Sequence, residues 1–114
     1  MATEVIVTTE FADWFEHLDE AEQRSVGRVI GLLEERGAIL EFPFSSGING
    51  SKFSQMRELR IQHAGEPYRV LYAFDPIRQA VLLVGGVKTG KGNRWYDEAI
   101  RLADRLFDEY LRGV

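Results

Sequence analysis

Residues 56–87, which read MRELRIQHAGEPYRVLYAFDPIRQAVLLVGGV, decide the fold of this chain of 114 residues. Apolar and polar side chains alternate with a period of two, first at Leu59 and Ile61 and then from Tyr68 to Phe74. Such alternation is typical of β-strands that bury one face and expose the other. We therefore expect two strands here, each with its apolar face against a core.

A third strand is expected from Ala80 to Val87, where nearly every residue is apolar. A continuous apolar run predicts a central strand that is buried on both faces. Short turns at residues 63–67 and at Asp75-Pro76 separate the three strands. Consecutive strands joined by short turns are expected to pair antiparallel.

The flanking sequence predicts one more strand and three helices. Residues 4–8 are β-branched and indicate a short strand, after which Thr9 is expected to cap a helix. Apolar residues recur at helical spacing over 11–18 and 26–33, and again over 95–110. Residues 38–51 contain Pro43, Gly47, Asn49 and Gly50 and predict a loop.

The expected fold class is therefore α+β, with an N-terminal strand and a helical hairpin before a three-stranded antiparallel meander. A C-terminal helix completes a small mixed sheet covered on both faces. The length suits a single domain spanning residues 1–114.

The composition narrows the class of protein. There are no cysteines, and His17 and His63 lack metal-ligand spacing, so we expect no metal and no cofactor. The longest apolar run near the N-terminus is too short for a signal peptide or a membrane span, which favours a cytoplasmic protein. The net charge is −4, but residues 1–51 carry 3 basic and 10 acidic residues, whereas residues 52–101 carry 9 basic and 5 acidic. This asymmetry is compatible with a phosphate-binding face or with an ordinary solvated surface.

Strand alternation gathers basic side chains on one face of the expected sheet. If Leu59 lies in the core beneath the helical hairpin, Arg60 and Arg69 both point to the opposite face. Lys88 follows the last strand and Tyr96 lies near the start of the last helix, so both are expected beside the same cleft. Further contacts to phosphate are expected from three more basic residues: Arg57, Lys91 and Arg94.

This set of residue types suits the cleavage of RNA without a metal ion. The 2′-hydroxyl of RNA can attack the adjacent phosphate if one group removes a proton, another donates one and cations neutralise the developing charge. Arginine forks match phosphate oxygens, and Tyr96 and Lys88 can exchange protons if neighbouring cations lower their pKa values. The alternative is structural: Arg60 pairs with Glu58 or Asp97, and Tyr96 only packs at the helix start.

A glycine-rich stretch, Gly85 to Gly92, approaches the pattern of a nucleotide-binding P-loop. A P-loop places Ser or Thr directly after its lysine to hold magnesium, whereas Gly92 follows Lys91 here. A strand-to-helix connection or a flexible phosphate-facing rim is the better interpretation.

The order of several motifs resembles that of the RelE/ParE-superfamily toxins, and most closely their phage-derived, HigB-like branch. The resemblance covers nearly the whole chain and is carried by four stretches: Met56-Arg57-Glu58-Leu59-Arg60, Tyr68 to Asp75, Leu82 to Gly90 and Arg94 to Ala99. RelE-like members carry further lysines where this chain has Met56 and Glu58.

The resemblance implies a toxin of a type II toxin–antitoxin system that cleaves messenger RNA in the ribosomal A site. It implies phosphate and transition-state contacts for Arg69 and acid–base work for Tyr96. Arg60 and Lys88 match two further basic positions of the family. The implied partners are the ribosome, its mRNA and a cognate antitoxin, often a helix-turn-helix protein. Two alternatives keep the same fold: an inhibitor of DNA gyrase like ParE, and an inactive module that only binds its antitoxin.

Overall fold

A five-stranded mixed sheet lies between helices in the computed structural model, which describes residues 2–113. In chain order the elements are β1 (Val5–Val7), α1 (Thr9–Glu16), α2 (Glu20–Arg36), the short 3-10 helix η1 (Gly37–Ile39), β2 (Ser45–Gly47), β3 (Met56–His63), β4 (Glu66–Phe74), β5 (Ala80–Val87) and α3 (Asn93–Arg112). The α+β class expected from the sequence is confirmed. None of these helices is both long and apolar enough to cross a membrane.

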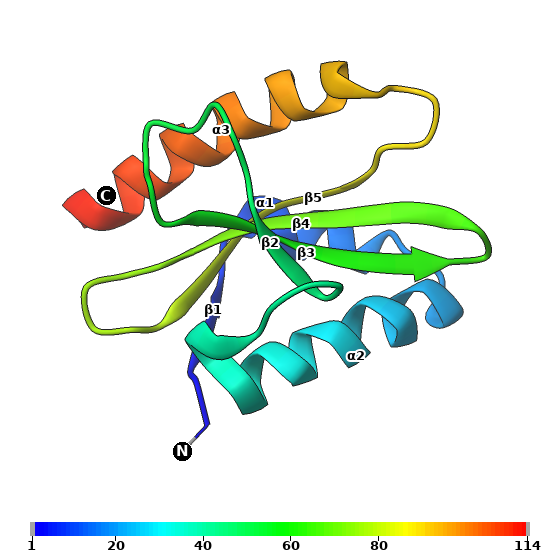
Figure 1. Ribbon diagram of the computed structural model, residues 1–114, viewed down its shortest axis with the longest axis horizontal. Helices are drawn as coiled ribbons and strands as arrows, with labels where there is room; N and C mark the ends of the chain where they lie inside the picture. Colours follow the sequence, from blue (N-terminus) through cyan, green and yellow to red (C-terminus); the bar gives the residue numbers. More distant parts are fainter. Residues whose placement is uncertain (1, 114) are drawn as a thin grey trace.

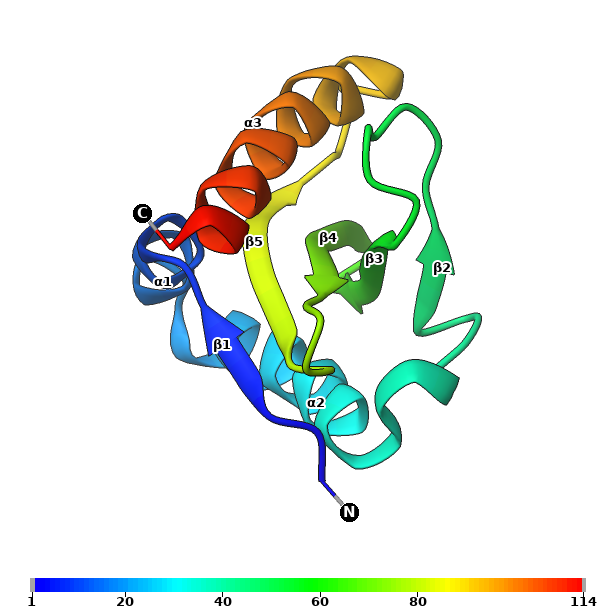
Figure 2. The same ribbon diagram turned by 90° about the vertical axis from the view of Figure 1, so that its left-hand side faces the viewer.

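The strands follow the order β1-β5-β4-β3-β2 across the sheet. The three long strands β3, β4 and β5 pair antiparallel in sequence, as their short turns predict. The short strand β1 pairs parallel with the start of β5, which makes the sheet mixed. Figures 1 and 2 show α2 on one side of this sheet and α3 on the other.

Alternate residues of the same strands feed two separate cores. On the side of α1 and α2, which we call the hairpin face, Leu59, Val70 and Tyr72 are fully buried. On the side of α3, which we call the α3 face, Leu71, Ala73 and Phe107 are fully buried. The sequence therefore correctly predicted which residues of each strand share a face of the sheet.

The two N-terminal helices begin with side-chain caps. The Asp19 carboxylate accepts from the backbone N–H of Glu22, whose carboxylate accepts in return from the N–H of Asp19. This capping box stabilises the start of α2 because it satisfies amides that have no partner within the helix. The cap of α1 is Thr8 and not Thr9, since the Thr8 hydroxyl accepts from the N–H of Phe11.

Two expectations about the sheet are wrong. The central strand is β4, because the unexpected strand β2 extends the sheet beyond β3. Residues 45–47 lie in the region predicted as a loop, and a run of only three residues gives no periodicity to detect. Secondly, the glycine-rich connection begins only after Val87: Gly85 and Gly86 lie within β5, whose bounds are those expected for this strand, with Trp14 packed over the first and Trp95 over the second.

Candidate functional site

The site is built on a pair of arginines that face each other across two strands. Arg60 on β3 and Arg69 on β4 are direct partners in the antiparallel register, and both side chains lie on the α3 face. Like charges directly opposite each other in a sheet are destabilising. The pair therefore needs a counter-charge on the same face.

Glu58 supplies that counter-charge from two residues before Arg60 on the same strand. One carboxylate oxygen accepts from Arg60 Nη1 at 2.8 Å and from the hydroxyl of Ser46 at 2.8 Å. The other lies 3.6 Å from Arg69 Nε and accepts from the phenol of Tyr96 at 2.5 Å. Since the Glu58 side chain is only 5% exposed, this carboxylate has exchanged water for three hydrogen-bond donors and the nearby charge of Arg69.

Tyr96 and Lys88 approach the arginine pair from the other side of the cluster. Tyr96 lies on the first turn of α3, and its phenol oxygen accepts from Arg69 Nε at 3.3 Å while donating to Glu58. Lys88 directly follows β5, and its ammonium nitrogen lies 5.2 Å from the centre of the Tyr96 ring. An ammonium at this distance over an aromatic face is attracted by the ring. The structure thus brings together all four residues expected to be catalytic.

The environment raises the pKa of Tyr96 above its ordinary value. Burial is the largest cause, because it disfavours the charged phenolate, and the hydrogen bond to Glu58 acts in the same direction. Arg69 opposes both effects without reversing them. The condition that neighbouring cations lower this pKa overall is therefore not met, and the phenol is protonated at neutral pH.

The two arginines differ in their access to a substrate. The Arg69 side chain is only 5% exposed, whereas that of Arg60 is 30% exposed. Arg69 also donates from Nη1 to the backbone carbonyl of Tyr68 at 2.9 Å, which fixes its orientation. The ion pair of Arg60 with Glu58 is the one that the structural alternative anticipated. Arg60, and not Arg69, is therefore the arginine that an incoming phosphate can reach directly.

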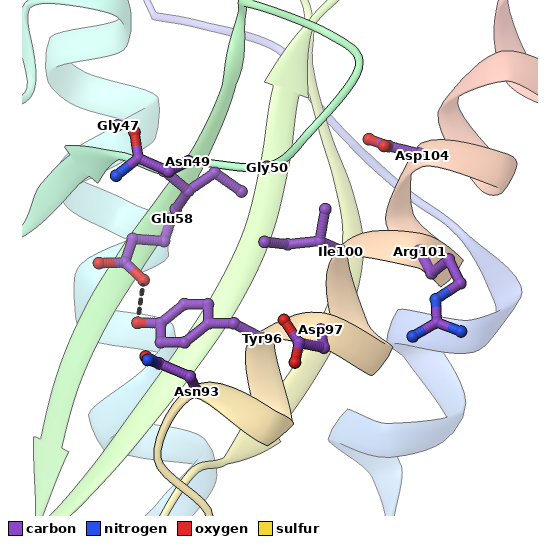
Figure 3. Close-up of a pocket in the computed structure, with 11 residues that line it drawn as sticks. Gly47, Asn49, Gly50, Glu58, Asn93, Tyr96, Asp97, Ile100, Arg101 and Asp104 are labelled. Carbon is purple, nitrogen blue, oxygen red and sulfur yellow. Dashed lines mark hydrogen bonds between the residues drawn. The ribbon is translucent and has the colours of Figure 1, made fainter.

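A cleft of about 660 Å³ opens beside this cluster, between α3 and the loop that follows β2. Figure 3 shows Glu58 and Tyr96 at one end of the cleft and Arg101 and Asp104 at the other. The cleft is lined by three carboxylates and one guanidinium: Glu58, Asp97, Asp104 and Arg101. It is therefore not the positive hollow that the sequence led us to expect, because neither Arg60 nor Arg69 is among its lining residues.

The three residues expected to contact phosphate are dispersed. Arg57 lies on the hairpin face, where its Nε donates to the Ser45 hydroxyl at 3.1 Å. Strand parity placed it with Leu59, and the structure separates it from the cluster. Lys91 and Arg94 are exposed, in the loop before α3 and on its first turn, so they lie at the rim near Lys88.

Sequence reasoning did not select Glu58 or Ser46 as site residues. The sequence did contain a signal for Glu58. It lies two residues before Arg60 on the same strand, so its carboxylate is on the face that carries Arg60 and Arg69. Ser46 had no such signal, since its place depends on pairing between β2 and β3.

Two solved structures share the fold. The E. coli toxin RelE, in the free state of a double arginine-to-alanine mutant, superimposes with a TM-score of 0.61 over 89% of this chain and 97% of that one, at 13% identity. An archaeal RelE from Pyrococcus horikoshii OT3, solved in complex with RelB, gives a TM-score of 0.57 over 79% and 99% of the two chains, at 16% identity. The class of protein that this fold defines is therefore RelE-like.

The family follows from the sequence. Residues 13–108 match the family described as phage derived protein Gp49-like (DUF891). The toxin candidate HigB3 of Mycobacterium tuberculosis is 43% identical over 107 residues, which cover 94% of this chain and 92% of the relative. The chain belongs to the Gp49-like family and is a HigB-like toxin of a toxin–antitoxin system with the fold of RelE, which confirms the resemblance seen in its motifs.

A second relative differs in length. The toxin candidate HigB2 of the same organism is 41% identical over 99 residues. These residues cover 86% of this chain but only 49% of HigB2, so the chain spans about half the length of that relative.

Proposed function

We propose that this toxin is an endoribonuclease that cleaves messenger RNA on the ribosome without a metal ion. The observation that carries the proposal is the convergence of Arg60, Arg69, Lys88 and Tyr96 around the carboxylate of Glu58, at the end of an open cleft. Cations, a phenol and a carboxylate within hydrogen-bonding reach are the groups that phosphate transfer to a 2′-hydroxyl requires.

The proton path begins at the 2′-hydroxyl of the substrate. That hydroxyl gives its proton to the phenol oxygen of Tyr96 while Tyr96 passes its own proton to Glu58, with which it already shares a 2.5 Å hydrogen bond. The raised pKa of Tyr96 suits such a relay, because a free phenolate never has to form. The bond from O2′ to phosphorus forms as the bond from phosphorus to O5′ breaks, and the Lys88 ammonium protonates the leaving O5′. The products are a 2′,3′-cyclic phosphate and a 5′-hydroxyl end.

The arginines have different tasks in this scheme. Arg60 is partly exposed and stabilises the charge that develops on the phosphate oxygens. Arg69 is buried and acts as a positioning residue, because it holds the oxygens of Tyr96 and Glu58 in place. Arg57, Lys91 and Arg94 contribute longer-range attraction for RNA, with Arg57 the weakest of the three because it lies on the hairpin face.

We further infer that a cognate antitoxin, in keeping with the helix-turn-helix partners common in this family, restrains the toxin. The archaeal RelE that shares this fold was solved together with RelB, which supports a protein partner for this scaffold. Co-expression with the protein encoded by the neighbouring gene is expected to restore growth and to yield a stable complex. Failure of that protein to bind or to restore growth would remove this part of the proposal.

The decisive experiment compares two tyrosine variants that each lose one hydroxyl from a tyrosine–glutamate pair. Tyr96→Phe is expected to lower the rate of mRNA cleavage by roughly 10²–10⁴-fold, because the proton relay is broken. Tyr68→Phe removes the matching hydroxyl that donates to Glu22 on the hairpin face and is expected to leave cleavage unchanged. Cleavage is measured with purified protein on mRNA bound to ribosomes and on the same RNA free, with growth arrest on induction as the readout in cells.

One observation favours a second candidate, a toxin-fold module without catalysis. Glu58 neutralises part of the arginine charge, and Arg69 is almost completely buried. Under this alternative, induction of the protein does not arrest growth and transcripts stay intact. Tyr96→Phe then changes neither growth nor the transcripts. DNA damage with intact transcripts would instead indicate inhibition of gyrase. Equal cleavage by wild type and Tyr96→Phe would overturn the proposed proton relay while leaving the nuclease.

A further inference from the structure

The cleft beside the cluster presents a contradiction for a nuclease, because its lining carries three carboxylates and a single guanidinium. Asp104 is already engaged, since its two oxygens accept from the hydroxyl of Ser51 and the backbone N–H of Lys52. Glu58 is saturated by the cluster described above. Asp97, by contrast, is exposed and has no hydrogen bond or ion pair to any of residues 2–113. Its carboxylate is therefore available to a ligand.

The charge of the lining decides which part of an RNA can enter. A phosphate would meet repulsion from Asp97, whereas the edge of a nucleobase carries no formal charge and presents N–H donors. Asn49 and Asn93 add neutral amide groups on either side of the cleft, one from the loop and one from α3. The lining thus matches a base, with the backbone held outside it.

The cleft has an apolar wall and the volume of a nucleotide site. Ile100 is 8% exposed and gives the α3 wall an apolar surface. The opposing wall contains Gly47 and Gly50, and a Cβ added at Gly50 would lie 4.0 Å from the Ile100 side chain. This is ordinary van der Waals distance, so Gly50 and Ile100 close the cleft where they meet, and its open volume lies beside that contact. A cavity of about 660 Å³ is within the usual range for small-molecule sites, so it has room for a nucleotide.

We propose that this cleft is a nucleobase subsite in which Asp97 selects guanine in the RNA beside the cleaved bond. Guanine alone among the four bases offers two adjacent N–H donors, at N1 and N2, that a single carboxylate can accept in parallel. Adenine and cytosine present one amino group, and uracil presents one N–H between two carbonyls that the carboxylate repels. Arg101, at the far end of the cleft, meets the phosphate of the neighbouring nucleotide. The subsite deepens the proposed function and rests on it for its biological role.

The test uses mononucleotides, so that binding is measured apart from cleavage. Isothermal titration of the purified toxin with 5′-GMP and with 5′-UMP isolates the base, because the two probes share their ribose and phosphate. Wild type is expected to bind GMP at least about tenfold more tightly, the usual discrimination of one bidentate contact. Asp97→Asn is expected to lose this preference, because an amide has one acceptor and one donor where the carboxylate has two acceptors.

The matched control is Glu98→Gln, which neutralises the next residue along α3, an exposed side chain outside the cleft lining. It is expected to keep the preference for GMP. Equal binding of GMP and UMP by wild type, or a preference that survives in Asp97→Asn, would overturn the subsite.

Sequencing of the cleaved RNA ends separates the subsite from the nuclease itself. Wild type is expected to cut next to guanine, and Asp97→Asn to cut with a weaker bias toward it. Cleavage without any base bias, together with equal binding of the two nucleotides, would refute the subsite and leave the nuclease standing. A preference for GMP in a protein that cuts no RNA would refute the nuclease and leave the subsite.

Discussion

The two faces of the sheet each hold a tyrosine whose phenol donates to a glutamate at 2.5 Å, and the two pairs differ in their neighbours. On the hairpin face Tyr68 donates to Glu22 of α2. On the α3 face Tyr96 donates to Glu58 and also accepts from Arg69. The hydrogen bond to Glu22 is the largest cause that raises the pKa of Tyr68, to about 12, whereas the pKa of Tyr96 is raised first by burial and lowered in part by Arg69.

The comparison teaches that the same pair of residues serves stability or chemistry according to the charges beside it. A tyrosine bonded only to a carboxylate holds its proton more tightly and fastens a helix to the sheet. A tyrosine between a carboxylate and an arginine has a stabilising partner for each protonation state, so moving its proton costs less. The exchange of Tyr68 and Tyr96 for phenylalanine, described above, tests this contrast directly. Three further changes test it through stability.

The largest effect on stability is expected at Leu59 of β3. Its neighbour Arg60 points to the opposite face and serves as the comparison. Leu59 is fully buried on the hairpin face, so Leu59→Ala is expected to lower the free energy of unfolding by about 2–5 kcal/mol. Arg60 is 30% exposed, so Arg60→Ala is expected to cost about 1 kcal/mol or less while reducing cleavage. Urea denaturation and the ribosome assay measure the two quantities. A larger loss of stability in Arg60→Ala than in Leu59→Ala would mean that the α3 face is as structural as the hairpin face.

An intermediate effect is expected from the two glycines of β5 that meet tryptophans on opposite faces. A methyl group at Gly85 would overlap the ring of Trp14, and one at Gly86 would lie 2.5 Å from Trp95 Nε1. Each of Gly85→Ala and Gly86→Ala is therefore expected to destabilise the fold by about 1–3 kcal/mol. Only Gly86→Ala is also expected to reduce cleavage, because Trp95 precedes Tyr96 on α3. Thermal unfolding and the cleavage assay measure these effects, with Gly27→Ala as the control, because a β-carbon added there meets nothing within 4 Å. An equal loss of cleavage in both β5 variants would contradict the division between the faces.

The smallest effect is expected at alkaline pH on the hairpin face. The pKa of Tyr68 is about 12 in the folded protein and 10 in its ordinary state, so the protonated phenol favours folding. The stabilisation is complete below pH 10 and is lost as the pH rises through 10 toward 12, where the unfolded chain releases the proton more readily. The difference in unfolding free energy between wild type and Tyr68→Phe should therefore shrink over this range. If the difference in unfolding free energy between wild type and Tyr68→Phe stays constant with pH, ionisation of the Tyr68 phenol does not contribute to stability.

Much of the fold was predictable because it depends on periodicity. The alternation in residues 56–74 predicted β3 and β4 and the opposite orientation of Leu59 and Arg60. The helical spacing of apolar residues over 26–33 predicted α2. The three residues of β2 gave no such pattern, because a strand this short is held by its pairing with β3.

The cationic and phenolic members of the candidate site were predictable, whereas Glu58, Ser46 and the charge of the cleft were not. Parity and order along the chain were enough to group Arg60, Arg69, Lys88 and Tyr96. The direction of the pKa shift at Tyr96 depends on burial under α3 and on contact with Glu58, neither of which is a local property. The same holds for the accessibility that separates Arg60 from Arg69.

The sequence by itself determined which residues share a face, because the direction of a strand side chain alternates whatever lies around it. Only the tertiary structure decided what those residues meet. The docking of α3 placed Tyr96 against Glu58 and left an acidic cleft where a positive one was expected. Solvation and charge neutralisation depend on all neighbours in space, so they follow from the packing of distant elements and cannot be read from spacing along the chain.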